Sequence, residues 1–311
     1  MEPLVSVVIP TRNRPELVQR AVKSALKQTL SQIEVIVVID GPDGLTSVAL
    51  AELDDARLKV IELPTNQGSC FARTTGVNAA SAEWIAFFDD DDEWMPEKLE
   101  LQLQAAKQSQ YKYPIISCYL IARTPLGESI WPRRLPQQSE AISEYLFVRN
   151  TLFQGEGIVQ TSTIFTRKEL MQKVPFDATQ HHDWDWLLQA TAQDGVGIEF
   201  VPQTLCIWYL GEVRPSVSRN RTWQSSLNWI KTKLDLVTPR AYSSFILAEV
   251  GARASHARDW KAFFPLLMEA LQFGKPRLKD IFLYLGMWFI SPDTRVKLRG
   301  LLTSKPKALS T

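Results

Sequence analysis

The amino-acid sequence predicts an α/β fold with a mostly parallel central sheet and helices on both faces. Short apolar runs of strand length alternate with helical patterns through the first third of the 311 residues, which is typical of βαβ units. Polar residues directly follow several of these runs, where ligands bind in such sheets. From about residue 222 the pattern is helical, which predicts an additional C-terminal helical region.

The expected elements follow one another in a regular order. The strands are 4–10, 33–39, 58–63, 83–88 and 113–121, and the helices are 16–28, one ending near 53, one ending at 80, and 96–108. Residues 120–157 are rich in turn signals such as "RTPLGES" and are not assigned. Beyond them we expect a strand at 157–166, helices at 167–174 and 183–193, a strand at 197–210 and a boundary near Arg221.

The composition is that of a globular protein with a substantial core. Hydrophobic residues make up 45% of the chain and charged residues 22%. Lys and Arg number 35 against 34 Asp and Glu, so the bulk charge indicates no nucleic-acid partner. Residues 222–311 carry 14 Lys and Arg against 6 Asp and Glu, which points weakly to an anionic surface such as lipid.

Cysteine use and hydropathy indicate the compartment. Cys70, Cys118 and Cys206 lie far apart among apolar residues, so we expect reduced core thiols and neither disulfides nor a zinc site. The opening "MEPLVSVVIPTRNRP" lacks a basic start and predicts a strand, not a signal peptide. The longest apolar run, 281–290, is about half of the ~20 residues that span a bilayer. We expect a cytoplasmic protein, soluble or peripheral at the inner face of the membrane.

Four strand ends converge on one edge of the predicted sheet. The polar residues at these ends are Thr11 to Asn13, Asp40, Asn66 to Ser69, and Asp89 to Asp92. No GxGxxG motif follows any strand and no GxxxxGK[ST] occurs, which disfavours dinucleotide and P-loop sites.

The run "FFDDDDEWMPEKLE" ends the fourth strand in four carboxylates. Mg²⁺ or Mn²⁺ is commonly held by one or two carboxylates plus substrate phosphates, and a cation would relieve the repulsion within the run. Alternatively, the acids complement the dipole of the next helix, which is worth about 0.3–1 kcal/mol each. One or two acids would suffice for that role, so we favour a site for metal and phosphate.

Four segments are distinctive when taken together: "VSVVIPTRNRPELVQRAVKSALKQT", "IEVIVVIDGPDG", "NQGSCFARTTGVNAASAEWIAFFDDDDEWMPEKLELQ" and "HHDWDWLLQ". In this order they resemble the family 2 glycosyltransferases, which have the nucleotide-diphospho-sugar-binding fold called GT-A. The resemblance is close over about 5–104 and moderate over about 155–189. It implies a GT-A domain at 1–221, with a nucleotide-binding half at about 1–120 and an acceptor half at about 121–221, then a helical region at 222–311.

The resemblance implies that the first strand end lines the nucleotide pocket. Pro10, Thr11 and Asn13 match the family pattern. Arg12 stands where an aromatic residue is common, so it would stack through its guanidinium plane or pair with phosphate.

Two further donor contacts follow from the resemblance. Asp40 lies where the family presents an acid to the nucleotide base, although Ile39 replaces the first acid of a frequent pair. Arg73, in "ARTTG", matches the arginine that reaches toward the nucleotide; the alternative is an ion pair on a helix surface.

The resemblance divides the acid run into roles. The DxD-type motif falls on Asp89 to Asp91, with Asp91 as the principal metal ligand. Asp89 or Asp90 contacts the ribose or metal-bound water, and Asp89 is the second candidate ligand. Asp92 is expected to cap the following helix.

The segment "HHDWDW" carries the expected catalytic base. His182 stands where the family often has glutamate, and Asp183 keeps the acid that takes the proton from the acceptor hydroxyl. Such direct displacement inverts the anomeric configuration. Asp185, two residues along the helix, is expected to face solvent.

The remaining candidates concern the acceptor or the diphosphate. They are Thr161, Ser162, His182, Trp184 and Arg214. No third His or Cys stands near the two histidines, so a metal site there is disfavoured.

The C-terminal segment "KPRLKDIFLYLGMWFISPDTRVKLR" suits two interpretations. With Tyr284 and Trp288 between basic clusters, it resembles a helix at the interface of an anionic membrane. The alternative, a core helix that packs on the catalytic domain, is slightly favoured.

Together these features predict a metal-dependent, inverting glycosyltransferase. It would move one sugar from a nucleotide-diphosphate donor to a sugar, lipid-linked or other hydroxyl acceptor, in cell-surface polysaccharide or glycolipid synthesis. The QxxRW motif that is typical of processive polymerases does not occur in the sequence, so we expect transfer of a single sugar. The alternatives are a non-catalytic nucleotide-sugar-binding module and a nucleotidyltransferase of similar fold. An aspartyl phosphatase would place its DxD after the first strand, where "PTRN" stands.

Overall fold

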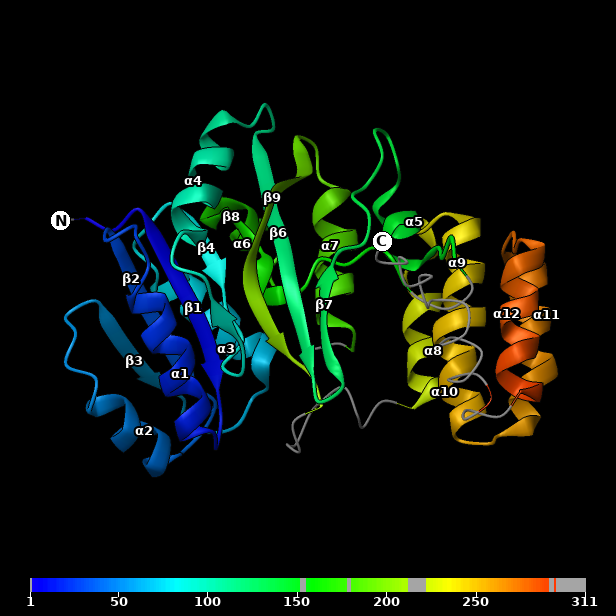
Figure 1. Cartoon of the computed structure of the whole chain (residues 1–311), viewed down its shortest axis with the longest axis horizontal. Coiled ribbons are helices and arrows are strands. Elements are labelled where there is room, and N and C mark those ends of the chain that lie inside the picture. Colours follow the sequence, from blue (N-terminus) through cyan, green and yellow to red (C-terminus); the bar gives the residue numbers. More distant parts are fainter. Residues whose placement is uncertain (1, 152–154, 178–179, 212–221, 291–293, 295–311) are drawn as a thin grey trace, which may run out of the picture. The chain divides into compact units, whose positions relative to one another are not determined.

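The computed structural model describes residues 2–151, 155–177, 180–211, 222–290 and 294 (Figure 1). The chain divides into two compact units. The first comprises Met1–Gln138 and Gly157–Pro215, and the second comprises Ser139–Glu156 and Ser216–Thr311. Residues 139–156, which lie within the expected acceptor half, therefore belong to the second unit.

A nine-stranded mixed sheet is the centre of the described part of the first unit. Its strands are β1 (Val5–Thr11), β2 (Ile33–Ile39), β3 (Leu58–Glu62), β4 (Trp84–Phe87), β5 (Glu93–Trp94), β6 (Tyr113–Thr124), β7 (Gly127–Trp131), β8 (Phe165–Arg167) and β9 (Val196–Tyr209). They are ordered β3-β2-β1-β4-β8-β6-β9-β5, with β7 paired to β6. The first four strands are parallel, β8 is antiparallel to β4 and β6, and β9 is parallel to β6.

Helices cover both faces of the parallel strands, as predicted. The helices of this unit are α1 (Pro15–Leu26), α2 (Gly44–Ala51), α3 (Ser69–Ala79), α4 (Lys98–Gln108), α6 (Lys168–Lys173) and α7 (His182–Thr191). Alternate residues of β1 and β2, such as Val7 and Val37, share one buried cluster with Val22 of α1. The other face meets α3 at Gly76, where a Cβ would lie 2.4 Å from Val8 Cγ1. Only glycine allows this close approach of helix and sheet.

One expected strand is largely wrong. Residues 157–166 were expected to be extended, but Thr161–Thr163 form a 3₁₀ turn, η1, and β8 begins only at Phe165. Gln160 caps this turn by accepting a hydrogen bond from the Ser162 N–H at 2.8 Å. The Thr163 hydroxyl donates to the Gln160 carbonyl at 2.7 Å. Such local bonds from polar side chains compete with strand pairing.

The second unit is helical in its described residues, which was predicted for 222–311 but not for 139–156. Its elements are α5 (Ile142–Phe147), α8 (Trp223–Lys231), η3 (Leu234–Leu236), α9 (Pro239–Phe245), η4 (Ile246–Val250), α10 (Gly251–His256), η5 (Trp260–Ala262), α11 (Phe263–Phe273) and α12 (Leu278–Phe289). The π-helical turn η4 joins α9 to α10 without a break. Rings of Phe147, Trp229 and Phe245 pack together in its core.

Two other expectations concern burial and membrane spans. Cys70, Cys118 and Cys206 are buried free thiols, as predicted. Within the described residues, no helix combines the length and the apolar character needed to cross a bilayer.

Candidate active site

The ends of the parallel strands come together at one edge of the sheet, as predicted. Thr11, the last residue of β1, pairs in register with Ile39 of β2, and its carbonyl accepts the Asp40 N–H at 2.9 Å. The Thr11 hydroxyl donates to Asp90 Oδ2 at 2.7 Å, across 79 residues of chain. The acid run beyond β4 therefore lies directly beside the end of β1.

Arg14 neutralises the middle of the acid run. Its guanidinium forms salt bridges with Asp90 at 2.8 Å and Asp91 at 3.1 Å. Asp90 is buried, and burial raises the pKa of this carboxyl even though Arg14 opposes that effect. Arg20 donates to the Asp91 carbonyl at 2.6 Å and so fixes the backbone of the run. Sequence reasoning missed both arginines, and the only signal was a cluster of basic residues after β1.

Arg73 is bound to the first acid of the run. Its Nη2 lies 2.6 Å from Asp89 Oδ1, and its side chain is buried. Burial alone would lower the pKa of Arg73, but the charge of Asp89 raises it above its usual value. This buried contact excludes the alternative of a surface ion pair for Arg73.

The expected helix cap at Asp92 is wrong. The next helix, α4, begins only at Lys98, because β5 intervenes and pairs with β9. Asp92 is fully buried and accepts hydrogen bonds from Ser162 Oγ at 2.6 Å and Gln160 Nε2 at 2.8 Å. Burial, with the charges of its neighbouring acids, raises the pKa of Asp92 well above its usual value.

Asp40 holds the loop that precedes α3. Its two carboxylate oxygens accept the backbone N–H groups of Gln67 at 2.7 Å and Gly68 at 2.9 Å. Asp40 is itself buried. The structure thus shows a loop-organising contact for the residue that we expected at the nucleotide base.

The loop after β1 is tied to the loop after β2. Asn13 has a left-handed backbone, with φ of 53°, and its N–H donates to Asp43 Oδ2 at 2.5 Å. Asp43 also caps α2 through the Thr46 N–H. Pro10 is buried, whereas Arg12 and Asn13 are exposed at this edge. The sequence analysis did not single out Asp43. Its position directly before a helical segment could have indicated a helix cap.

The start of α7 brings the predicted base to the site. Asp183 accepts a hydrogen bond from the Thr161 hydroxyl. His182 Nδ1 lies 3.1 Å from the Cys70 sulfur on α3. Burial raises the pKa of the Cys70 thiol to about 11. Trp184 stacks on His181, with ring centroids 4.9 Å apart.

The expectation for Asp185 is wrong. This residue is buried, and its carboxylate accepts a hydrogen bond from Gln189 one turn further along α7. The side chain two positions from Asp183 points into the protein because α7 packs that face against the unit. Arg214, the remaining candidate, lies outside the described residues.

The turn η1 connects the acid run with the start of α7. Ser162 Oγ accepts the Asp89 N–H at 3.0 Å and donates to Asp92. The neighbouring Thr161 binds Asp183. Gln160 reaches both Asp92 and Asp89 Oδ2, the latter at 3.3 Å. Residues expected to hold the donor and to act as base are therefore joined by one short turn.

Asp89 and Asp91 are the two carboxylates of the acid run that could hold a divalent cation together with substrate oxygens. Asp89 and Asp91 keep 25% and 17% of their side chains exposed, whereas Asp90 keeps 6%. Among the described residues, no group of three or more His, Cys, Asp or Glu is arranged to hold a metal. Two carboxylates suit Mg²⁺ or Mn²⁺ when diphosphate oxygens supply further ligands.

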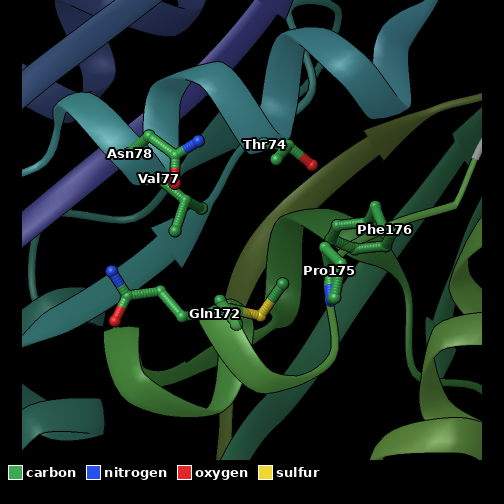
Figure 2. A pocket seen from close by; sticks show the side chains of 7 residues that line it. Thr74, Val77, Asn78, Gln172, Pro175 and Phe176 are labelled. Carbon is green, nitrogen blue, oxygen red and sulfur yellow. The ribbon is translucent and has the colours of Figure 1, made fainter.

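A small hollow of about 190 Å³ lies away from these residues, between α3 and α6. Figure 2 shows Thr74, Val77 and Asn78 on one side and Gln172, Pro175 and Phe176 on the other. None of the predicted site residues lines it. One residue of its wall, Phe176, lies near the site, with its ring 5.4 Å from the Arg73 guanidinium.

Residues 6–174 match the family described as Glycosyl transferase family 2, and the chain belongs to this family of glycosyltransferases. AmsB of Erwinia amylovora, an amylovoran biosynthesis glycosyltransferase, is 27% identical over 255 residues, which are 76% of this chain and 82% of AmsB. WfgD of Escherichia coli is named UDP-Glc:alpha-D-GlcNAc-diphosphoundecaprenol beta-1,3-glucosyltransferase. It is 35% identical over 133 residues, 42% of this chain and 53% of WfgD.

Solved structures confirm the expected fold. Residues 1–349 of TarS from S. aureus match with a TM-score of 0.57 and 16% identity, over 96% of this chain and 83% of that one. The same TarS segment in complex with UDP-GlcNAc matches with a TM-score of 0.53 and 18% identity, over 92% of this chain and 79% of that one. The GT-A fold expected from the sequence motifs is therefore present.

Proposed function

We propose that the protein is an inverting, metal-dependent glycosyltransferase that transfers a single sugar from a nucleoside-diphosphate donor to an acceptor hydroxyl. The observation that carries this proposal is the link through η1 between the acid run and Asp183. This turn holds the Asp183 carboxylate in a defined position relative to the acid run, whose carboxylates we propose to bind metal and diphosphate. In this proposal residues 1–120 bind the nucleotide, and the later residues of the first unit, 121–138 and 157–215, contribute to the acceptor site.

We propose a uridine diphosphate sugar as the donor. TarS was solved with UDP-GlcNAc, and WfgD is named for UDP-Glc, which support this base. Four residues would meet the nucleotide because they lie at the sheet edge next to the acid run: Pro10 and Thr11, which end β1, and Arg12 and Asn13, which follow it. Arg12 is exposed there and suits stacking or a phosphate contact.

The transfer step requires one base and one stabilised leaving group. Asp183 takes the proton from the acceptor hydroxyl while that oxygen attacks the anomeric carbon. The bond from this carbon to the diphosphate oxygen breaks, and the leaving oxygen keeps the electron pair, so the configuration inverts. Asp91 and Asp89 would hold Mg²⁺ or Mn²⁺, which when bound would stabilise the negative charge of the leaving diphosphate.

The cationic residues reduce the repulsion that a diphosphate would meet. Arg14 and Arg73 together pair with three of the four aspartates of the run. Without them, the negative charge of the carboxylates would oppose an anionic donor at close range. Ser162, His182 and Trp184 stand near the base and are proposed to shape the acceptor or diphosphate site, with Arg214 as a further candidate.

The acceptor is proposed to be a sugar or lipid-linked saccharide in cell-surface polysaccharide or glycolipid synthesis. AmsB is named for amylovoran biosynthesis and WfgD for a diphosphoundecaprenol-linked acceptor, which supports this class. We place the reaction at the cytoplasmic face of the membrane, where nucleotide sugars and lipid-linked acceptors meet.

A panel of UDP-, GDP- and dTDP-sugars tests this proposal. Binding and hydrolysis should depend on Mn²⁺ or Mg²⁺ and should be strongest for one uridine donor. A nucleotidyltransferase would instead consume nucleoside triphosphate and sugar phosphate. A non-catalytic binding module would bind a donor without turnover, and the Asp183→Asn variant would then behave like the wild type.

A further inference from the structure

An apolar surface is exposed on the helical hairpin of α11 and α12. It consists of Phe264, Met268 and Leu271 on α11, Leu278, Phe282 and Phe289 on α12, and the neighbouring Trp260. Their exposed fractions run from 47% for Leu271 to 76% for Leu278. We call these seven residues the hairpin face. Large apolar side chains that gather on an exposed surface commonly mark a site of interaction.

The residues of each helix recur at helical spacing. Phe264, Met268 and Leu271 follow the i, i+4, i+7 pattern on α11. Leu278, Phe282 and Phe289 lie on one stripe of α12, at i, i+4 and i+11. Each stripe therefore forms a continuous line along its helix.

The core of the unit is built by the opposite sides of the same helices. Phe263, Leu266 and Ala270 of α11 are buried. On α12, Tyr284 and Trp288 are buried, and the Tyr284 hydroxyl donates to the Phe263 carbonyl at 2.8 Å. The two aromatic residues that the sequence suggested for a membrane contact are thus core residues. The exposed stripes are additional apolar surface that the fold of this unit does not use.

The two stripes meet where the helices adjoin. Phe263 at the start of α11 contacts α12 through Tyr284 and Phe289, with ring centroids 5.4 Å and 5.6 Å apart (Figure 1). Trp260 and Phe289 have ring centroids 5.7 Å apart at one end of the hairpin. At the other end, the short connection 274–277 joins Phe273 to Leu278. The two stripes are therefore carried by one helical hairpin and approach each other at its Trp260 end.

Basic residues flank the hairpin face at both ends. Lys261 lies beside Trp260, and Lys275, Arg277 and Lys279 lie at the connection between the helices. The acids of this region are engaged within the unit: Asp259 with Trp223, Glu269 with Lys231 and Tyr242, and Asp280 with Arg277. Asp280 neutralises Arg277, and Lys231 neutralises Glu269. Lys261, Lys275 and Lys279 against Asp259 therefore leave a net positive charge around the apolar surface.

We propose that the hairpin face docks on an anionic lipid bilayer. Apolar side chains with a basic rim are the chemistry of a helix that lies in the membrane interface. Each helix is too short to cross a bilayer, since α12 has 12 residues against the ~20 required. Docking would hold the enzyme at the surface where a lipid-linked acceptor is found, but it does not depend on the proposed transfer reaction.

Vesicle co-sedimentation of the full-length protein tests the proposal. The vesicles contain phosphatidylcholine alone or with about 30% phosphatidylglycerol, as a model of an anionic leaflet. We expect the protein to bind the anionic vesicles at least about tenfold more strongly, and to lose affinity as salt rises. Equal binding to both vesicle types, or none to either, would overturn the proposal.

Two matched variants locate the surface. Phe264→Ser with Phe282→Ser should weaken binding to anionic vesicles about tenfold or more, because both rings are lost from the hairpin face. Leu45→Ser with Leu126→Ser removes two exposed apolar side chains from the first unit and should leave binding unchanged. Thermal melting checks that all variants fold.

Sedimentation velocity without vesicles tests whether a second copy of the chain, instead of a membrane, binds the hairpin face. We expect the wild type and the Phe264→Ser/Phe282→Ser variant to have the same oligomeric state. A wild-type dimer that this variant dissociates would assign the hairpin face to a second copy of the chain and overturn the membrane proposal.

Discussion

The Thr161 hydroxyl donates a hydrogen bond to the carboxylate of Asp183 at the start of α7. The next residue, Ser162, accepts the Asp89 N–H and donates to the buried Asp92. Two consecutive residues of η1 thus connect the proposed base with the proposed metal and diphosphate site. A displacement of this turn would alter both parts together.

Thr161 is expected to position Asp183. Thr161→Val removes the hydroxyl at nearly constant volume and should lower kcat roughly 10- to 100-fold, because the carboxylate loses its fixed orientation. The KM for the donor should change little. Thr161→Ser keeps the hydroxyl and should restore most of the activity in steady-state kinetics. Equal losses in both variants would assign Thr161 a packing role instead.

Asp91 and Asp90 are expected to behave differently. Asp91→Asn should weaken metal-dependent donor binding about tenfold or more, measured by calorimetry, since Asp91 is a partly exposed candidate ligand. Asp90 is buried against Thr11 and Arg14, so Asp90→Asn should mainly lower the free energy of unfolding, by about 1–3 kcal/mol. Asp54→Asn, at an exposed position, is the matched control. If Asp90→Asn instead weakened metal-dependent donor binding and Asp91→Asn did not, the metal ligand would be Asp90.

Removal of divalent cations should weaken donor binding. Dialysis against EDTA should reduce UDP-sugar binding about tenfold or more, because the diphosphate would then face carboxylates that only arginines offset. Added Mn²⁺ or Mg²⁺ should restore it. Full activity in EDTA would contradict the proposed metal role of Asp89 and Asp91.

Glu34 is expected to make stability depend on acid pH. Although burial tends to raise the pKa of Glu34, hydrogen bonds from Lys59, Ser6 and Ser81 lower it to about 2. Because the folded-state pKa lies below the usual 4.5, the contribution to stability is complete above about pH 4.5 and is lost as the pH falls toward 2. Glu34→Gln should destabilise the protein by about 1–3 kcal/mol at pH 7 and flatten this dependence in denaturant titrations. The control variant Glu16→Gln, at an exposed position on α1, should leave the stability at pH 7 and its pH dependence unchanged.

The strands of the parallel region could be predicted because their signal is local. The run 33–39 is apolar throughout and ends at "DGPDG", and β2 has these bounds. Thr161 to Thr163 misled the strand prediction for the opposite reason. Threonine and serine favour strands on average, but here their hydroxyls and the Gln160 side chain bond to nearby groups and close a turn.

The partners of the acid run could not be predicted from the sequence. Four identical aspartates give no local indication of which one is buried, and the answer depends on groups more than 60 residues away in the chain. Asp92 is buried because Gln160 and Ser162 approach it, with sequence separations of 68 and 70. Asp185 is buried because of how α7 packs. These outcomes depend on tertiary contacts, which periodicity alone does not specify.

The most direct test of the proposed function is a comparison of donor binding and sugar transfer in Asp183→Asn, with Asp194→Asn beyond the end of α7 as the control. Asp183→Asn should bind the UDP-sugar with Mn²⁺ as the wild type does, while transfer falls by roughly 10²- to 10⁴-fold because the base is absent. Asp194→Asn should keep both. Transfer at the wild-type rate in a folded Asp183→Asn variant would contradict the account.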